Sequence, residues 1–500
     1  MGIIARQSIK ASLLGLIGVA IGAVSRLFLY TKFLSTSEIG TLETIVKLGL
    51  LLTPFFIIGA PQVITRYFHR FKNDKDDSGL IFTYSSLLLF VLIPISSLLY
   101  LLNKDFIYSL YTEAPELEKY FWLPLVVAIS YGGFNFLKSI SIVHLRITIP
   151  AFFSGVLDRM LVMFLLFAFG YFHWIDVQQF YYLNILLFFC LPFALMVIYV
   201  FAYLKPKLKL PSFKQSLNIL NVSRSYNSYL LFGSISSVVI ASIDVNMIAG
   251  GLGLELAGVY TIAYFMGMVI EIPKRSLTNI IYPILNKAVI KKDALEIKSL
   301  YQKSSINQFL VGSFIFLIIW LNIDQIFMII PNGDDFVAGK LVVLFIGLSK
   351  LFDMLMGVNK EIIELSKYYR FNLVLAVLLS VLVIVLNLIF IPLKSAVFGG
   401  INGVAFASLL ALFISNLLAF VIVWRKEKIH PFTLNHGKIF VVISLSSMLC
   451  YFIQVEHPIL SVCLTTACIT LCYIFLTLAL NISEDFMNLF EAAKDKLIKK

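Results

Sequence analysis

Fourteen apolar segments, each long enough to cross a lipid bilayer as a helix, run through almost the whole chain and limit what it can fold into. A spanning helix needs roughly 20 mostly apolar residues. Segments of that kind occupy about 9–34, 43–66, 80–102, 120–143, 152–172, 178–203, 225–249, 256–282, 306–330, 338–358, 371–393, 400–424, 437–455 and 459–481. Since 60% of the residues are hydrophobic and only 14% are charged, the sequence predicts an all-α integral membrane protein with 14 transmembrane helices.

The basic residues are divided unevenly between the two sides of the membrane that these spans define. An even number of spans places both termini on one side. Thirty Lys and Arg residues then fall on that side, five on the other and five within spans. Cytoplasmic loops are enriched in Lys and Arg, so both termini are predicted to be cytoplasmic. This bias also explains the net charge of +12. We therefore expect the phospholipid bilayer as a partner and no nucleic acid, because no basic soluble domain is present to hold one.

The cysteines and histidines do not form a pattern that carries chemistry. The five cysteines lie within apolar segments, where thiols usually pack as small hydrophobes, and their spacing fits no zinc site. The six histidines lie in loops or at span ends, and no pair has ligand spacing. No nucleophile is accompanied by a base. The sequence therefore predicts no catalytic residue, no metal, no cofactor and no enzymatic activity.

Two segments far apart in the chain are similar in their key positions. Gly40 and Gly258 each follow a spanning segment and open the next, and the residues 14 positions before them are Arg26 and Asp244. Both segments start from the same side of the membrane, which indicates a parallel repeat with its axis along the membrane normal.

This repeat predicts the domain organisation. We expect an N-terminal six-helix lobe at 1–204, a cytoplasmic linker at 205–224 and a second six-helix lobe at 225–424. Residues 425–500 would add two helices and a cytoplasmic tail. Pro54 and Pro273, at 14 and 15 positions after the two glycines, extend the similarity between the lobes.

Three stretches carry recognisable motifs. They are LSTSEIG after the first span, SIDVNMIAGGLGLELAGVYTIAY at 242–264 and LNLIFIPLKSAVFGGINGVAFASLLALFISN at 386–416. These stretches resemble motifs of the polysaccharide exporters in the multidrug/oligosaccharidyl-lipid/polysaccharide flippase superfamily. The chain departs from the family pattern at Ser35-Thr36-Ser37, where Gly-Pro-Glu is usual, and in the longer segment Lys394–Phe398. The order and spacing of the three stretches extend the resemblance over nearly the whole chain.

The resemblance implies a fold, a location and an activity. The fold would be two lobes in a V shape around a central cavity that opens alternately to each side of a bacterial cytoplasmic (inner) membrane. The activity would be that of a flippase moving undecaprenyl-pyrophosphate-linked oligosaccharide from the inner to the outer leaflet. Such units serve the synthesis of O-antigen of lipopolysaccharide, capsule or exopolysaccharide, with glycan polymerase machinery as a further partner.

Charged residues at membrane depth are the candidates for contact with such a headgroup, because a charge there is costly and usually faces protein, water or a ligand. The substrate-binding candidates are Arg26, Lys47, Asp244, Glu271, Lys350 and Asp353. For Arg26, roughly 20 Å along its helix at 1.5 Å per residue, three roles are open. It can reach the outer headgroups, pair with Asp244 to close an outer gate, or bind pyrophosphate through its planar fork of donors.

The other candidates also have more than one explanation. Lys350 and Asp353, three residues apart, can form a simple ion pair. Glu271, just before Pro273, can serve as a proton or sodium site or as the partner of Lys47.

Alternative functions remain open at the level of the sequence. One is a cation-coupled multidrug exporter of the same superfamily, which usually has twelve spans and a cavity with acidic and aromatic residues. Another is a lipid II flippase, which also has fourteen spans. A membrane glycan polymerase or ligase would need a sizeable external loop with polar catalytic residues. The longest external loop here is only the short stretch NKDFIYSLYTEAPELEK.

Overall fold

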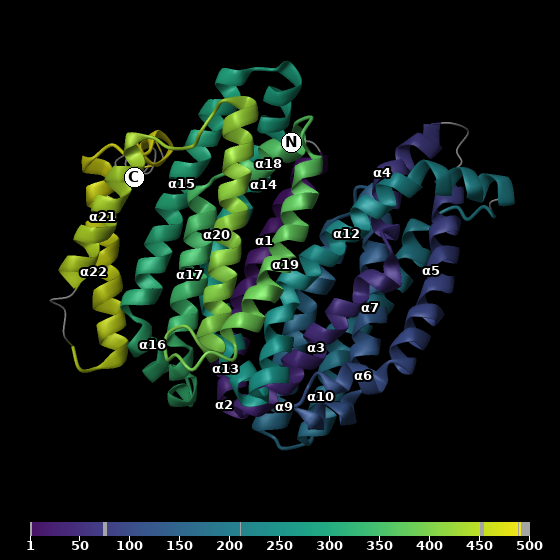
Figure 1. The fold of residues 1–500 in the computed structure, drawn as a ribbon, viewed down its shortest axis with the longest axis horizontal. Coiled ribbons are helices and arrows are strands. Elements are labelled where there is room, and N and C mark those ends of the chain that lie inside the picture. Colours follow the sequence, from purple (N-terminus) through teal and green to yellow (C-terminus); the bar gives the residue numbers. More distant parts are fainter. Residues whose placement is uncertain (1–2, 74–77, 211, 451–454, 489, 492–500) are drawn as a thin grey trace. The chain divides into compact units, whose positions relative to one another are not determined.

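The computed structural model describes residues 3–73, 78–210, 212–450, 455–488 and 490–491, and within these ranges all regular structure is helical (Figure 1). Among the described residues, twelve helices or continuous helical runs are long and apolar enough to span a membrane. A further pair, Gly333–Leu355 and Asn359–Leu365, passes the same test together and is bent by 50°. With the shorter apolar helix Leu434–Cys450, each predicted span has a counterpart in order. The prediction of an all-α membrane fold is confirmed.

The chain forms two compact units, Met1–Gly258 and Val259–Lys500. In the first unit the elements are α1 (Ile3–Val24), a π-helical turn η1 (Ser25–Tyr30), α2 (Thr31–Phe33), α3 (Thr36–Ile57), α4 (Ala60–Asn73), α5 (Ser78–Leu102), α6 (Lys104–Ser109), the 3-10 helix η2 (Pro115–Tyr120), α7 (Trp122–Val143), α8 (Thr148–Phe152), η3 (Phe153–Leu157), α9 (Asp158–Gly170), α10 (Val177–Ile185), η4 (Leu186–Cys190), α11 (Leu191–Tyr199), η5 (Val200–Leu204) and α12 (Phe213–Leu252). Helix α13 (Leu254–Met268) begins in the first unit and continues into the second.

In the second unit the remaining elements follow. They are η6 (Val269–Glu271), α14 (Ile272–Lys291), α15 (Ala294–Leu321), α16 (Ile323–Ile329), η7 (Gly333–Gly339), α17 (Lys340–Leu355), α18 (Asn359–Leu365), α19 (Arg370–Phe390), α20 (Gly400–Glu427), α21 (Leu434–Cys450) and α22 (Pro458–Ala479). Helices α21 and α22 pack on each other and on α15, as Figure 1 shows at the yellow end of the colour scale.

Polar capping residues determine where two of the helices begin. The Ser35 hydroxyl accepts from the Glu38 backbone N–H (3.3 Å), and the Glu38 carboxylate accepts from the Ser35 N–H (2.8 Å). This reciprocal capping box starts α3 where the exporter-like motif has Gly-Pro-Glu. Ser212 and Gln215 form the same box at the start of α12. Because that helix begins at Phe213, the irregular part of the predicted linker 205–224 is shorter than expected.

Prolines account for the breaks in the two repeat-related helices. In α3, Pro54 lies in the last turn, and the chain then bends through Ile58 (φ 29°) and Gly59 (φ 73°). The predicted eighth span is interrupted by η6 just before Pro273, which gives α13 and α14. A proline within a helix removes a backbone donor and clashes with the preceding turn. One of these breaks places Glu271 at the junction of α13 and α14.

Apolar side chains are found both inside each unit and on its outside. In the first unit Ile64, Ile81 and Met196 are fully buried in a core formed by α4, α5, α7 and α11. On α5, by contrast, Phe90 is 78% exposed and Leu102 73% exposed. Water-soluble proteins rarely expose contiguous apolar surface of this kind, whereas a bilayer accommodates it. The exposed apolar surface is therefore the lipid-facing side of the helices.

Candidate functional site

The two glycines that defined the sequence repeat lie against each other. A Cβ atom added to Gly40 would lie 1.8 Å from the Leu254 carbonyl oxygen, and one added to Gly258 would lie 1.9 Å from that of Thr36. Thr36 and Leu254 are themselves repeat-related, since each lies one helical turn before its glycine. Each glycine thus lies against the carbonyl one turn before the other glycine. A local two-fold axis between the two glycines produces such a reciprocal pair of contacts. Small residues allow such close backbone approach between membrane helices.

The loop between α6 and η2 fastens the end of α12 beside this crossing. The Tyr111 hydroxyl donates to Asn246 Oδ1 (2.6 Å), and both side chains are buried. The Thr112 hydroxyl and the Glu113 backbone N–H both donate to the Gly250 carbonyl, at 3.0 and 3.3 Å. Three donors from one short loop therefore hold the last two turns of α12.

Arg26 lies on the π-helical turn η1 and forms an ion pair with a residue that sequence analysis did not single out. Its guanidinium is 2.6 Å from Glu43 Oε1, and the Glu43 side chain is only 6% exposed. Single π-helical turns within α-helices often occur at functional sites. Glu43 stands at the start of the second predicted span, so no helical periodicity connects it with Arg26.

Lys47 shares a face of α3 with Glu43, one turn further on. Its ammonium group donates to the Ala241 carbonyl of α12 (2.9 Å). Glu43, Arg26 and Asp244 all act electrostatically on Lys47, and Asp244 is buried. The structure thus brings together three of the predicted site residues, Arg26, Lys47 and Asp244, with Glu43 as a fourth. We call these four residues the Arg26 cluster; its two positive and two negative charges balance.

A second charged group lies in the second unit around Asp353 on α17, which is buried. This carboxylate contacts the Lys274 ammonium group of α14, and Lys360 Nζ lies 3.1 Å from Oδ1. Asn416 of α20 donates its side-chain N–H to the same oxygen at 2.9 Å. Asp353 does not form an ion pair with Lys350, three residues earlier, so the interpretation of these two residues as a simple local pair is wrong.

Lys350 instead forms an ion pair with Glu271. The distance from Lys350 Nζ to Glu271 Oε2 is 2.6 Å, and Arg275 Nε lies 3.1 Å from Oε1. Both carboxylate oxygens of Glu271 are therefore held by cations. Three predicted residues, Glu271, Lys350 and Asp353, belong to one group, which we call the Asp353 cluster and which also includes Lys274, Arg275, Lys360, Glu361 and Asn416. Its four basic residues outnumber its three carboxylates.

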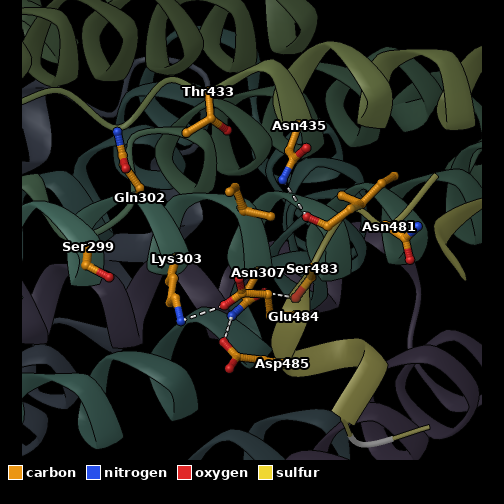
Figure 2. Close-up of a pocket in the computed structure, with 12 residues that line it drawn as sticks. Ser299, Gln302, Lys303, Asn307, Thr433, Asn435, Asn481, Ser483, Glu484 and Asp485 are labelled. Atoms are coloured by element: carbon orange, nitrogen blue, oxygen red, sulfur yellow. Dashed lines mark hydrogen bonds and ion pairs between the residues drawn. The ribbon is translucent and has the colours of Figure 1, made fainter. Parts of the chain in front are cut away.

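A polar pocket of about 230 Å³ lies beside the starts of α15 and α21 and the end of α22 (Figure 2). Polar side chains that line this pocket bond to one another. Lys303 pairs with Glu484 (2.9 Å), Asn307 donates to Asp485 (2.7 Å), and Ser483 donates to Asn307 (2.6 Å). Each of these charged groups already has a protein partner. We interpret this pocket as the junction that attaches the last two helices to α15.

No group of three or more His, Cys, Asp or Glu residues suited to a metal ion occurs in the described part of the chain. The charged clusters consist of ion pairs and amide hydrogen bonds. A phosphate oxygen can make the same kind of charge-assisted contact with such a cation as a carboxylate oxygen does.

Comparison with known proteins places the fold. No family model and no curated protein sequence matches the chain. A solved structure of the lipid II flippase MurJ, in an inward closed conformation, is similar with a TM-score of 0.70 at 14% identity. The match covers 94% of this chain and 98% of that one. The chain has the fold of this flippase.

Two transporters of the MOP superfamily are similar over a smaller share of the chain. An inward-facing MATE family transporter of the MOP superfamily has a TM-score of 0.55 at 16% identity, covering 85% of this chain and 94% of that one. A MOP superfamily transporter from Pyrococcus furiosus, described as having a binding pocket of reverse polarity, has a TM-score of 0.52 at 15% identity, with 85% and 96% covered. The three solved structures are those of a flippase and of two transporters, and the similarity concerns the fold.

Proposed function

We propose that this protein is a flippase that moves a polyprenyl-pyrophosphate-linked oligosaccharide from the inner to the outer leaflet of a bacterial cytoplasmic membrane. Alternating access of two lobes would carry the headgroup through the membrane for surface polysaccharide synthesis, with both termini in the cytoplasm. The observation that carries the proposal is the extent of the fold match. The lipid II flippase structure covers 94% of the chain, whereas the multidrug transporter covers 85%.

The difference in coverage has a natural explanation. The predicted C-terminal addition, 425–500, is about the size of the part that the multidrug transporter does not cover. A chain with these helices is closer in organisation to a lipid-linked sugar flippase than to a drug exporter.

The charged clusters also suit a pyrophosphate headgroup better than a cationic drug. In the Asp353 cluster, Lys350 and Lys274 are only 15% and 12% exposed. A pyrophosphate oxygen can replace the protein carboxylate beside such a cation, which exchanges one charge-assisted contact for another. In the Arg26 cluster the Glu43 carboxylate holds the guanidinium fork, which is well shaped for bidentate contact with phosphate. Exchange of partners allows the headgroup to bind and then leave.

The test uses purified protein in liposomes that contain a polyprenyl pyrophosphate carrying a neutral disaccharide. An impermeant glycosidase added outside cleaves only headgroups in the outer leaflet. We expect wild-type protein to make nearly all of the headgroups accessible with time, whereas protein-free liposomes stop near one half. Arg26→Gln and Lys350→Gln should slow this at least tenfold.

The matched control is Lys340→Gln, which removes a cation from the solvent-exposed pair with Asp324 (2.6 Å) and should leave the rate unchanged. The same liposomes are then tested for accumulation of a cationic dye under a proton or sodium gradient. Dye accumulation with no gain in headgroup accessibility would replace the proposal with multidrug export.

A further inference from the structure

A cavity of about 300 Å³ lies within the first unit between α3, α4, α7 and α12, away from the ion pair of Arg26. Lys138 on α7 contributes its side chain to the wall. This residue lies five positions before the end of α7 at Val143, about 8 Å from the predicted cytoplasmic end of the helix. We call this space the Lys138 cavity.

Lys138 differs from Arg26 and Lys350 in having no acidic partner among the described residues. Within the described ranges no carboxylate lies within ion-pair distance of its ammonium group, whereas Arg26 and Lys350 each have one at 2.6 Å. Membrane-depth cations normally pair with another residue or mark a ligand pathway. A cation that lines a cavity and lacks a counter-ion is suited to an anionic ligand.

The other polar groups of the wall present mainly hydrogen-bond acceptors. The Ser139 hydroxyl donates to the Phe136 carbonyl (2.6 Å), and the Asn135 amide N–H donates to the Tyr131 carbonyl (2.9 Å). The Ser139 hydroxyl donor and one Asn135 N–H are therefore used within the helix, while the side-chain oxygens of both residues can accept hydrogen bonds. The Gln62 amide oxygen is buried and accepts no hydrogen bond from the described residues. A ligand with several hydroxyl donors would satisfy these oxygens.

We propose that the Lys138 cavity binds one acidic sugar ring, with its carboxylate on Lys138 and its hydroxyl groups on the acceptor oxygens. The volume is at the lower end of the range for small-molecule sites, which fits a single ring. Tyr131, 39% exposed on the wall, offers an apolar ring face beside the polar groups. The inference rests on the proposed function for its biological role, since the ring would belong to the glycan of the transported lipid.

The test measures binding of free sugars to the purified full-length protein in nanodiscs of phosphatidylcholine, by saturation-transfer NMR. We expect glucuronate to bind saturably in the millimolar range and glucose at least tenfold more weakly. Lys138→Gln should weaken glucuronate binding at least tenfold and have little effect on glucose. The matched control, Lys119→Gln, removes an exposed cation of the outer loop and should bind glucuronate like the wild type.

Two further measurements separate the parts of the proposal. Gln62→Leu removes the buried acceptor and should weaken both sugars about threefold or more. Inorganic phosphate serves as the competing anion. If phosphate displaces glucuronate at equal concentration, the cavity is a simple anion site and the sugar assignment is wrong. Unchanged glucuronate binding by Lys138→Gln would also overturn the proposal, provided that the variant keeps the thermal stability of the wild type.

This experiment is independent of the liposome assay. If the wild type binds glucuronate through Lys138 but exposes neither the neutral disaccharide lipid nor the same lipid carrying a glucuronic acid ring, the proposed function fails and the sugar site stands. If it exposes headgroups but shows no preference for glucuronate over glucose, only the sugar site is refuted.

Discussion

The contact between Gly40 and Gly258 can be tested by adding a single methyl group. In Gly40→Ala the new Cβ would lie 1.8 Å from the Leu254 carbonyl oxygen, whereas real Cβ atoms stay at least 3.0 Å from such neighbours. The two backbones would therefore have to move apart locally by at least the difference between these two distances. The obstacle is backbone, which cannot rotate away as the tip of a side chain can.

The expected cost follows from the packing. Forcing a methyl group into a well-packed contact costs about 1–3 kcal/mol. Replacing glycine by alanine within a helix stabilises the helix by up to ~1 kcal/mol, because alanine has the higher helix propensity. We therefore expect Gly40→Ala to be destabilised by about 1–2 kcal/mol. Gly437→Ala is the matched control, because a Cβ atom there has nothing within 4 Å, and it should be neutral or slightly stabilised.

The assay is reversible unfolding in mixed micelles titrated with SDS, followed by circular dichroism. The double variant gives a sharper result than either single variant. Gly258→Ala places its methyl group in the same gap, 1.9 Å from the Thr36 carbonyl oxygen, so one separation relieves both clashes. The losses of unfolding free energy in the two single variants should therefore add up to more than the loss in the double variant. Equal stability of Gly40→Ala and Gly437→Ala, or full additivity, would refute the reasoning.

The same titration tests three other contacts. Asp353→Asn leaves two lysines without their carboxylate and should lower the free energy of unfolding by about 3–5 kcal/mol. Asp324→Asn breaks an exposed pair and should lower it by less than ~1 kcal/mol. Similar values for the two variants would refute a structural role for the buried pair. Tyr111→Phe removes the hydroxyl that donates to the buried Asn246 oxygen and should cost about 1–3 kcal/mol. No loss would show that the loop between α6 and η2 does not fasten α12. Ser35→Ala removes the cap of α3 and should cost about 1 kcal/mol, and an unchanged midpoint would contradict the role of the capping box.

The number and order of the membrane helices could be predicted from the sequence because one strong effect, the cost of placing polar groups in the hydrocarbon core of the bilayer, determines which segments span it. A span must be apolar over its length whatever its neighbours are, so each predicted segment has a helical counterpart. Individual positions of the predicted repeat could also be singled out, since close backbone contact requires glycine and a helix break favours proline, whereas the repeat of two six-helix lobes stays a prediction. Gly40, Gly258 and Pro273 each mark such a local requirement.

The partners of the charged residues could not be predicted in the same way. Lys350 and Asp353 are three residues apart, which favours a local pair, yet Asp353 contacts Lys274 and Lys350 pairs with Glu271. Both of these partners lie around the start of α14, far from α17 in the chain. Which of two suitable cations a carboxylate meets depends on how each helix is rotated about its axis, and composition does not encode that rotation.

The ion pairs found in both units bear on how a flippase could release its cargo. A headgroup with two phosphates would bind very tightly to cations that had no other partner, and such binding would prevent its exit. Glu43 and Glu271 already form ion pairs with Arg26 and Lys350. A phosphate that replaces one of these carboxylates therefore gains only the difference in interaction free energy between the two partners of the cation. Transport requires binding that is favourable enough for entry and weak enough for departure. If the protein has the proposed function, the internal carboxylates would limit the affinity for the headgroup, and Glu43→Gln or Glu271→Gln should bind the pyrophosphate lipid more tightly while exposing it more slowly in the glycosidase assay.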